Sequence, residues 1–309
     1  MIKRTLYFGN PAYLSLNNSQ LMVRLPEVAT NSELPDAFKK EATASIPIED
    51  IGVVMLDHTR ITITQALIAA LLDNNVALIT CNDTHHPTGL MLPLDVHNIQ
   101  HERFVAQIGS SQPLRKQLWQ QTVTNKILNQ AAILKMRGKD HARLLTLARN
   151  VRSGDPENCE GTAANYYWGN LFDETLQFRR GREGEPPNNL LNYGYAILRA
   201  MVARCLVGSG LLPTLGIHHR NKYNAYCLAD DVMEPYRPYV DQVVCRIMES
   251  GLDYNELTTD IKKELIGIAS TDVMLDSESS PMLVAMQRTT ASLAHCFEGT
   301  SRRISYPEM

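Results

Sequence analysis

The 309-residue sequence lacks the marks of several protein classes. Its six cysteines form no C-x-x-C pair and most lie in apolar surroundings, which excludes a zinc ribbon and favours reduced core thiols. No run approaches the roughly 18 apolar residues of a membrane-spanning helix, and the N-terminal segment lacks the apolar stretch of a signal peptide. We therefore expect a cytoplasmic protein that has no membrane partner.

Three common enzyme motifs are also missing. The sequence contains no G-x-x-x-x-G-K-[ST] loop, no G-x-G-x-x-G turn and no G-x-S-x-G elbow. The sequence therefore lacks the motifs that usually indicate a P-loop hydrolase, a Rossmann oxidoreductase or an α/β-hydrolase.

The chain as a whole has no large excess of either charge, because it contains 30 Lys and Arg residues and 33 Asp and Glu residues. That balance excludes indiscriminate binding to polyanions. The charges are unevenly distributed, however, with a net charge of -4 over residues 1–95, +6 over 96–205 and -5 over 206–309. The basic middle, which includes Lys126, leaves room for a local basic face.

The pattern of apolar residues predicts an α+β fold in two domains. Residues 1–95 hold short β-prone runs between turn-forming clusters, with one embedded helix at Gln65–Leu72. Beyond them, apolar residues recur at the i, i+3, i+4 spacing of helices. We expect a small β-rich domain over 1–95, a larger all-helical domain over 96–309, and loops at 179–189 and 271–281. The candidate helices cover residues 99–108, 112–134, 139–150, 159–171, 188–208, 228–250, 255–269 and 280–297.

The stretch from His218 to Asp241 carries the densest group of potential ligands. The adjacent His218 and His219 precede a helix start that includes Asp231 and Glu234. These acids are three residues apart and therefore share one helical face. One imidazole with carboxylates suits Mg²⁺ or Mn²⁺. An acid-rich helix start, in which the helix dipole stabilises the acids, explains the same spacing equally well.

A further carboxylate stands at Glu160, at the start of another predicted helix with small residues at 161, 163 and 164. Small residues permit the close approach of a second helix or a ligand. Taken alone, Glu160 is best explained as an acid at a helix N-terminus. Together with a histidine and a second acid, it can bind a divalent ion with positions left for water or phosphate.

Several basic and aromatic side chains are candidates for contacts with nucleic acid. A compact arginine run can contact phosphates, although a solvated loop is the more common explanation of such a run. An aromatic ring can stack on an unpaired base, and core packing is the competing role. The candidates are Arg179, Arg180, Arg182, Arg220, Lys222 and Tyr166.

Four segments carry a resemblance that covers nearly the whole chain. They are RTLYFGNPAYLSL, CEGTAANYYW, PNNLLNYGYAILRA and LGIHHRNKYNAYCLADDVMEPYRPYVD. Together they resemble the CRISPR-associated integrase of spacer acquisition, the family called CRISPR-associated protein one, in its type II form. The histidine-to-acid segment that ends in E-P-Y-R-P is the most specific part.

The resemblance implies a metal-binding triad of an acid, a histidine and a second acid, with Mg²⁺ or Mn²⁺ as the cofactor. The acids fall on Glu160 and Glu234. The spacing to the acidic helix favours His219 as the histidine, and His218 would then be its neighbour. Asp231, three residues before the last ligand, would contact the ligands without being one of the triad itself.

The resemblance further implies a metal-dependent endonuclease and integrase that acts in antiviral defence. It would join the 3′-hydroxyl ends of pre-spacer DNA to the CRISPR repeat by transesterification. The β-rich domain would form a homodimer and the helical domain would be catalytic. The implied partners are double-stranded DNA and a small second CRISPR-associated protein in a hetero-hexamer, with the type II effector nuclease as a further candidate.

Two alternatives remain open from the sequence. A similar metal site can cut branched DNA, so the chain can be a metal-dependent nuclease that joins nothing. The acids can also serve only as helix caps, which would make the chain a non-catalytic DNA-binding scaffold. Joined DNA products distinguish the first alternative, and Mn²⁺ binding distinguishes the second.

Overall fold

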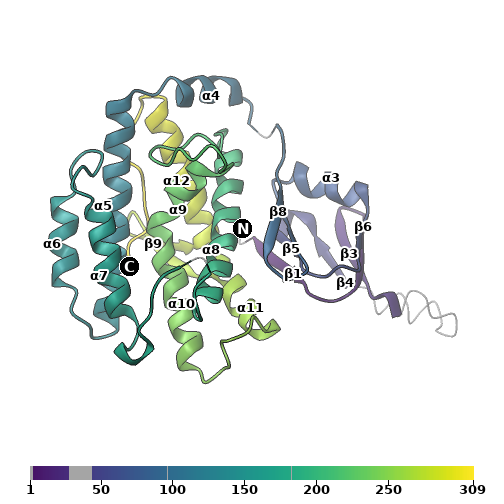
Figure 1. The fold of residues 1–309 in the computed structure, drawn as a ribbon. Coiled ribbons are helices and arrows are strands. Elements are labelled where there is room, and N and C mark those ends of the chain that lie inside the picture. Colours follow the sequence, from purple (N-terminus) through teal and green to yellow (C-terminus); the bar gives the residue numbers. More distant parts are fainter. Residues whose placement is uncertain (1–2, 28–43, 96, 182) are drawn as a thin grey trace. The chain divides into compact units, whose positions relative to one another are not determined.

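The computed structural model describes residues 3–27, 44–95, 97–181 and 183–309. The chain divides into two compact units, Met1–Val96 and His97–Met309. The first unit is strand-rich and the second is largely helical (Figure 1), so the predicted α+β class is confirmed.

The described part of the first unit contains two four-stranded sheets and an α-helix. In one sheet, β1, β5 and β7 run parallel, and β8 pairs with β7 in the antiparallel direction. In the other, β3 pairs antiparallel with β2 and β4, and β6 runs parallel to β2. The elements are β1 (Arg4–Phe8), β2 (Ala12–Asn17), β3 (Gln20–Arg24), β4 (Ala44–Pro47), β5 (Ile51–Leu56), β6 (Ile61–Ile63), α3 (Gln65–Asp73), β7 (Ala77–Cys81) and β8 (Pro87–Met91).

Apolar side chains from both sheets and α3 form one core in the first unit. Thr64 starts the helix because its side-chain oxygen accepts from the N–H of Leu67 at 3.4 Å. Leu67 and Leu71, one turn apart on α3, are fully buried in this core with Ile51. Strand β8 was not expected, because a proline and a glycine weaken its signal; such residues are tolerated at a sheet edge.

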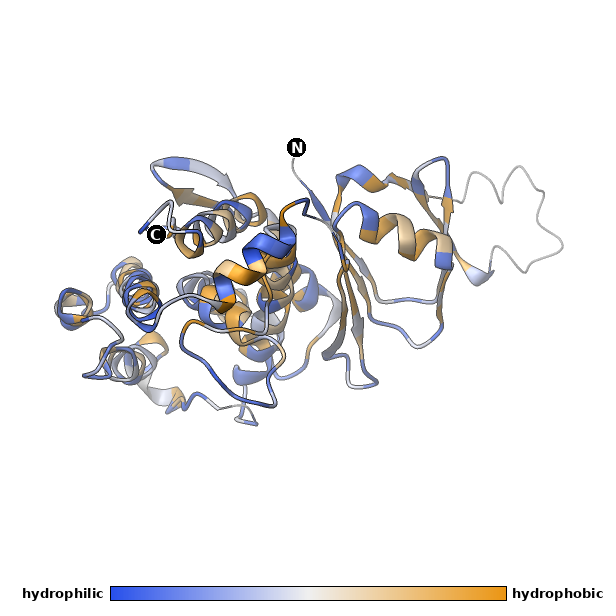
Figure 2. Cartoon of the chain, turned by 90° about the horizontal axis from the view of Figure 1, so that it is seen from above, coloured by the Kyte–Doolittle hydropathy of each residue, from blue (hydrophilic) through white to orange (hydrophobic). Residues whose placement is uncertain are grey.

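The second unit packs its helices in two groups. In Figure 1, α6 and α7 lie beside α5, while α8 is flanked by α9, α10 and α12. Apolar and polar residues alternate along the helices in Figure 2, as expected where one face is buried. The helices are α4 (Gln100–Ile108), α5 (Gln112–Met136), α6 (Ala142–Asn150), α7 (Cys159–Leu171), α8 (Asn188–Gly208), α9 (Cys227–Met233), α10 (Arg237–Glu249), α11 (Thr259–Ile266) and α12 (Met282–Phe297).

Helix α8 is the central helix of its group. Within the described chain it alone is long and apolar enough to cross a membrane, and 78% of its apolar window is buried inside the protein. Fifteen of its 21 residues are buried, on every side of the helix. This is the pattern of a core helix in a globular unit.

Two predictions of secondary structure in the second unit are wrong. The expected helix over 228–250 is interrupted at Glu234–Tyr236 by a 3₁₀ turn. Prolines at 235 and 238 cause the break, since each lacks the N–H that would continue the α-helical bonding. The expected loop at 271–281 is a hairpin of β9 (Asp272–Leu275) and β10 (Glu278–Pro281), closed by two residues with positive φ, Asp276 and Ser277.

Candidate metal and nucleic-acid site

A lysine from α5 joins the two acids that the sequence analysis singled out. The Nζ atom of Lys126 lies 2.6 Å from Oε1 of Glu160 and 2.6 Å from Oε2 of Glu234. Glu160 belongs to the first turn of α7, and Glu234 follows the last turn of α9. Lys126 itself is only 8% exposed. Three elements that are distant in the sequence therefore converge on one positive charge.

The start of α7 leaves the Glu160 carboxylate free of any capping role. The side chain of Asn158 accepts from the N–H of Gly161 at 3.2 Å. The Asp155 carboxylate accepts from the N–H groups of Cys159 and Glu160, each at 2.9 Å. The backbone N–H groups at the start of α7 are thus bonded to Asn158 and Asp155 and not to the Glu160 side chain. This weakens the explanation of Glu160 as a helix cap.

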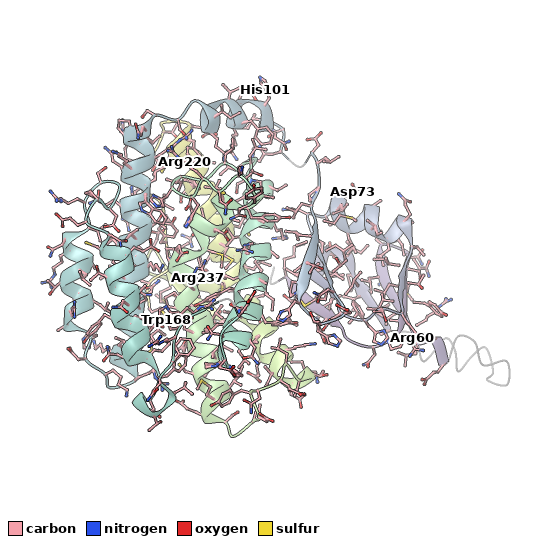
Figure 3. All side chains as sticks on the ribbon, viewed as in Figure 1. Arg60, Asp73, His101, Trp168, Arg220 and Arg237 are labelled. Atoms are coloured by element: carbon pink, nitrogen blue, oxygen red, sulfur yellow. The ribbon has the colours of Figure 1, made fainter. Side chains whose placement is uncertain are left out.

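Glu234 is a buried carboxylate held by two cations. Its Oε1 atom lies 2.9 Å from Nε of Arg237, and its Oε2 atom faces Lys126. Burial alone would raise the pKa of Glu234, but the charges of Arg237 and Lys126 outweigh it and lower that pKa to about 2. Figure 3 shows Arg237 among the packed helices of the second unit. Glu234 is therefore an anion throughout the physiological pH range.

His219 is oriented by Asp231, whose side chain is completely buried. Nδ1 of His219 lies 2.6 Å from Oδ1 of Asp231, and the same carboxylate accepts from the backbone N–H groups of His218 and His219. The hydrogen bond to Asp231 raises the pKa of His219 against the effect of burial, and the charges of Glu234 and Glu160 raise it further. The ring nitrogen left for another partner is Nε2.

His218 has a different role from its neighbour. Its ring stacks on the buried ring of Trp119, with centroids 4.2 Å apart and planes 5° from parallel. His219 meets the same tryptophan edge-on at 5.8 Å. The geometry therefore favours His219 over His218 as a ligand. His219 combines an orienting carboxylate with a ring nitrogen, Nε2, that remains for a ligand, whereas the ring of His218 is stacked on Trp119.

The side chains of Glu160, Glu234 and His219 are of types that bind a divalent ion, but in this structure the two carboxylates are spaced around the Lys126 ammonium. Throughout the described chain, no group of three or more His, Cys, Asp and Glu side chains converges closely enough to hold a metal ion. Carboxylate oxygens and one imidazole nitrogen are nevertheless ligands that Mg²⁺ and Mn²⁺ accept. The Lys126 ammonium stands between the carboxylates as a stand-in cation, which marks a position where positive charge is stabilised.

The arginine run is divided by the fold. Arg179 is exposed. Arg180 is half-buried, and its guanidinium donates to the side chains of Asn188 and Asn192 at 2.9 and 2.8 Å. We therefore assign Arg180 to holding its own loop. Arg182 lies outside the described residues.

Exposed basic and aromatic groups follow the paired histidines along the chain. Arg220 and Lys222 are both exposed, on the loop before α9 (Figure 3 labels Arg220). Tyr223 is 85% exposed, and Nζ of Lys222 lies 4.8 Å from its ring centre. Tyr166 is half-buried, and its hydroxyl donates to the carboxylate of Asp140 at 2.9 Å. The loop before α9 therefore presents the more accessible basic and aromatic groups.

Residues 7–264 match the family described as CRISPR associated protein Cas1. The chain belongs to the Cas1 family. It is 36% identical to the CRISPR-associated endonuclease Cas1 of Neisseria meningitidis serogroup C (strain 8013), over 100% of this chain and 97% of the relative. A Cas1 of Pyrobaculum aerophilum is 27% identical over 69% of this chain and 76% of its own.

Solved structures show the same fold. A casposase bound to an integration product superposes with a TM-score of 0.77 at 20% identity, covering 98% of this Cas1-family chain and 92% of its own. A Cas1 protein from Thermotoga maritima superposes with a TM-score of 0.73 at 15% identity, covering 96% and 97%. At these identities the likeness establishes the shared fold.

Two residues of the site in this Cas1-family chain were missed from the sequence. Lys126 was counted only toward the basic middle, and Arg237 was not considered. Arg237 stands three residues after Glu234, a spacing that places both on one helical face. Lys126 falls on the same face of its predicted helix as Trp119 and Val123, where an isolated lysine indicates a buried ion pair.

Proposed function

We propose that this Cas1-family chain is a divalent-metal-dependent DNA integrase of CRISPR adaptation, acting in the cytoplasm. It joins the 3′-hydroxyl ends of pre-spacer DNA to the CRISPR repeat by transesterification. The observation that carries this proposal is the meeting of Glu160 and Glu234 around one cation, beside the Asp231-oriented ring of His219. A relative named an endonuclease and a structural neighbour bound to an integration product support the same class of chemistry.

Glu160, Glu234 and Nε2 of His219 would hold the Mg²⁺ or Mn²⁺ ion. When bound, the ion supplies Lewis-acid polarisation of a phosphate and a lowered pKa for an attacking hydroxyl. Asp231 fixes the tautomer and the direction of the His219 ring, and Arg237 keeps Glu234 ionised. The remaining contribution of the protein is orientation, since holding a 3′ end against the target phosphate makes the reaction effectively unimolecular.

The proposed partners follow from exposed charge and from the structural neighbours. Arg179, Arg220 and Lys222 would contact phosphates of double-stranded DNA, with Arg182 as a further candidate. A neighbour solved as a Cas6-RT-Cas1--Cas2 complex supports a small second CRISPR-associated protein as partner, in the proposed hetero-hexamer with homodimers of this chain. The β-rich unit is proposed to form the homodimer, and the type II effector nuclease is proposed on the sequence resemblance.

A strand-transfer assay tests this function. It combines the full chain, the small partner, a labelled pre-spacer duplex and a supercoiled plasmid that bears the array, with Mn²⁺ or EDTA. We expect a nicked, labelled plasmid with Mn²⁺ and none with EDTA. Glu160→Gln should abolish the product, and exposed Lys135→Gln on α5 serves as the matched control. Transfer of equal yield in EDTA would refute the metal dependence.

A nuclease on branched DNA is the second candidate, because the relatives carry the name endonuclease. The same assay separates the two functions by their products. Joined DNA supports the integrase, and cut DNA without joining supports the nuclease. A non-catalytic scaffold would bind DNA and give neither product.

A further inference from the structure

Lys126 is placed where a soluble protein seldom places a lysine. It projects from the middle of α5, its side chain is 10% exposed, and its ammonium contacts one oxygen of Glu160 and one of Glu234. An ammonium withdrawn from water is stabilised only when it is paired and hydrogen-bonded. The two acids supply that pairing, so the chain carries its own counter-ion at the candidate metal site.

The two cations around Glu234 differ in how firmly they are held. The guanidinium of Arg237 lies 4.6 Å from the ring centre of Tyr195, and the Tyr195 hydroxyl is fixed by Asp241 at 2.5 Å. Arg237 is thus anchored on both sides. Lys126 instead holds the acids through a single ammonium on a flexible four-carbon chain. Of the two, Lys126 is the cation on the more flexible side chain.

The surroundings provide a direction for movement of this side chain. The Glu234 side chain is 5% exposed, whereas Glu160 and His219 are 25% and 43% exposed. The site therefore opens to solvent on the side of Glu160 and His219. One turn after Lys126, Asn129 donates to the carbonyl of Pro235 at 2.8 Å. This bond fastens α5 to the turn that carries Glu234, so the side chain can move while the helix stays in place.

We propose that Lys126 is an internal counter-ion that the divalent cation displaces when it binds. The ammonium holds Glu160 and Glu234 together in the metal-free protein, and the exchange sets the metal affinity. A divalent ion that uses the same two oxygens competes with the ammonium for them and is repelled by its charge. This inference rests on the proposed metal-dependent function.

Mn²⁺ affinity provides the first test. The Kd is measured by calorimetry on the full-length wild type, on Lys126→Met and on Lys135→Met, a matched change at an exposed lysine of the same helix. We expect Lys126→Met to bind Mn²⁺ at least tenfold more tightly than wild type and Lys135→Met to be unchanged. An unchanged Kd in a folded Lys126→Met protein would overturn the inference.

Chemical labelling of the wild type provides the second test and needs no variant. Amine acetylation followed by mass spectrometry compares Lys126 with Lys135, in EDTA and in saturating Mn²⁺. We expect labelling of Lys126 to be at least fivefold faster in Mn²⁺, with Lys135 equally reactive in both. Continued protection of Lys126 would show that the ammonium stays in place. Absence of Mn²⁺ binding in every protein would overturn the proposed metal-dependent function as well, which separates the two failures.

Discussion

The Asp231 carboxylate holds His219 by both its ring and its backbone. Oδ1 lies 2.6 Å from Nδ1 of the imidazole, and the two carboxylate oxygens accept from the N–H groups of His218 and His219 at 2.9 and 3.2 Å. One buried acid therefore fixes the position, the tautomer and the direction of the candidate ligand. The consequences can be measured.

The pH dependence of Mn²⁺ binding should reflect this hydrogen bond. The His219 pKa is raised by Asp231, and metal binding requires the neutral ring, so affinity should increase with pH through a midpoint above 6.5. The effect on folding has the opposite sign: stability from the charged ring is present below 6.5 and is lost as pH rises through the raised pKa. Asp231→Asn should lower the midpoint and weaken Mn²⁺ binding roughly 10- to 100-fold. Calorimetry between pH 5.5 and 8.5 provides the measurement, and identical midpoints would contradict the assignment.

The two adjacent histidines should differ sharply when substituted. His219→Ala should reduce strand transfer to background, because it removes the proposed nitrogen ligand. His218→Ala should keep most activity and lose about 1 kcal/mol of stability, since it removes a ring stacked on Trp119. Strand-transfer yield and urea unfolding of both proteins test this order. The reverse order would make His218 the ligand.

Substitution of Glu160 and of Glu234 should cost different amounts of stability, although we expect both substitutions to abolish activity. Glu234→Gln removes the anion that faces both buried cations, leaving Arg237 unpaired there and Lys126 with Glu160 alone, and should cost about 3 kcal/mol of unfolding free energy. Glu160→Gln, at a quarter-exposed side chain, should cost about 1 kcal/mol or less. In wild type, the Glu234 contribution is present above its ordinary pKa of 4.5 and is lost as pH falls toward about 2. Urea titrations at pH 7 and pH 3.5 measure both effects, and equal losses at pH 7 would argue against them.

Basic residues before α9 should affect DNA binding, and Arg180 should affect the fold. Arg220→Ala and Lys222→Ala should each weaken duplex binding and reduce the salt dependence by about one counter-ion. Arg180→Ala should lower thermal stability, because it removes donors to Asn188 and Asn192. Fluorescence anisotropy across a salt series, alongside thermal melts, measures both. A normal salt slope in the Arg220→Ala, Lys222→Ala double variant would exclude this loop from the DNA interface.

The sequence predicted much of the fold because helices and strands depend on local spacing. The helices of the second unit lie close to their predicted positions, since apolar residues recur along them at the helical period. The break at Pro235 and the hairpin at 272–281 were missed. In the first case the apolar spacing continues across the prolines, and in the second each strand has only four residues and β10 is polar.

The sequence by itself determined the fold class, the Cas1-type segments and the residue types that can hold a divalent ion. Only the tertiary structure brought Glu160 and Glu234 to the same ammonium, stacked His218 on Trp119 and turned His219 toward Asp231. The physical reason is the range of the interactions. Periodicity and capping act over a few residues of one chain segment, whereas burial and charge pairing depend on which distant segments fold against one another. In the sequence Lys126 was for that reason only one of many basic residues, and in the structure it is the central cation of the site.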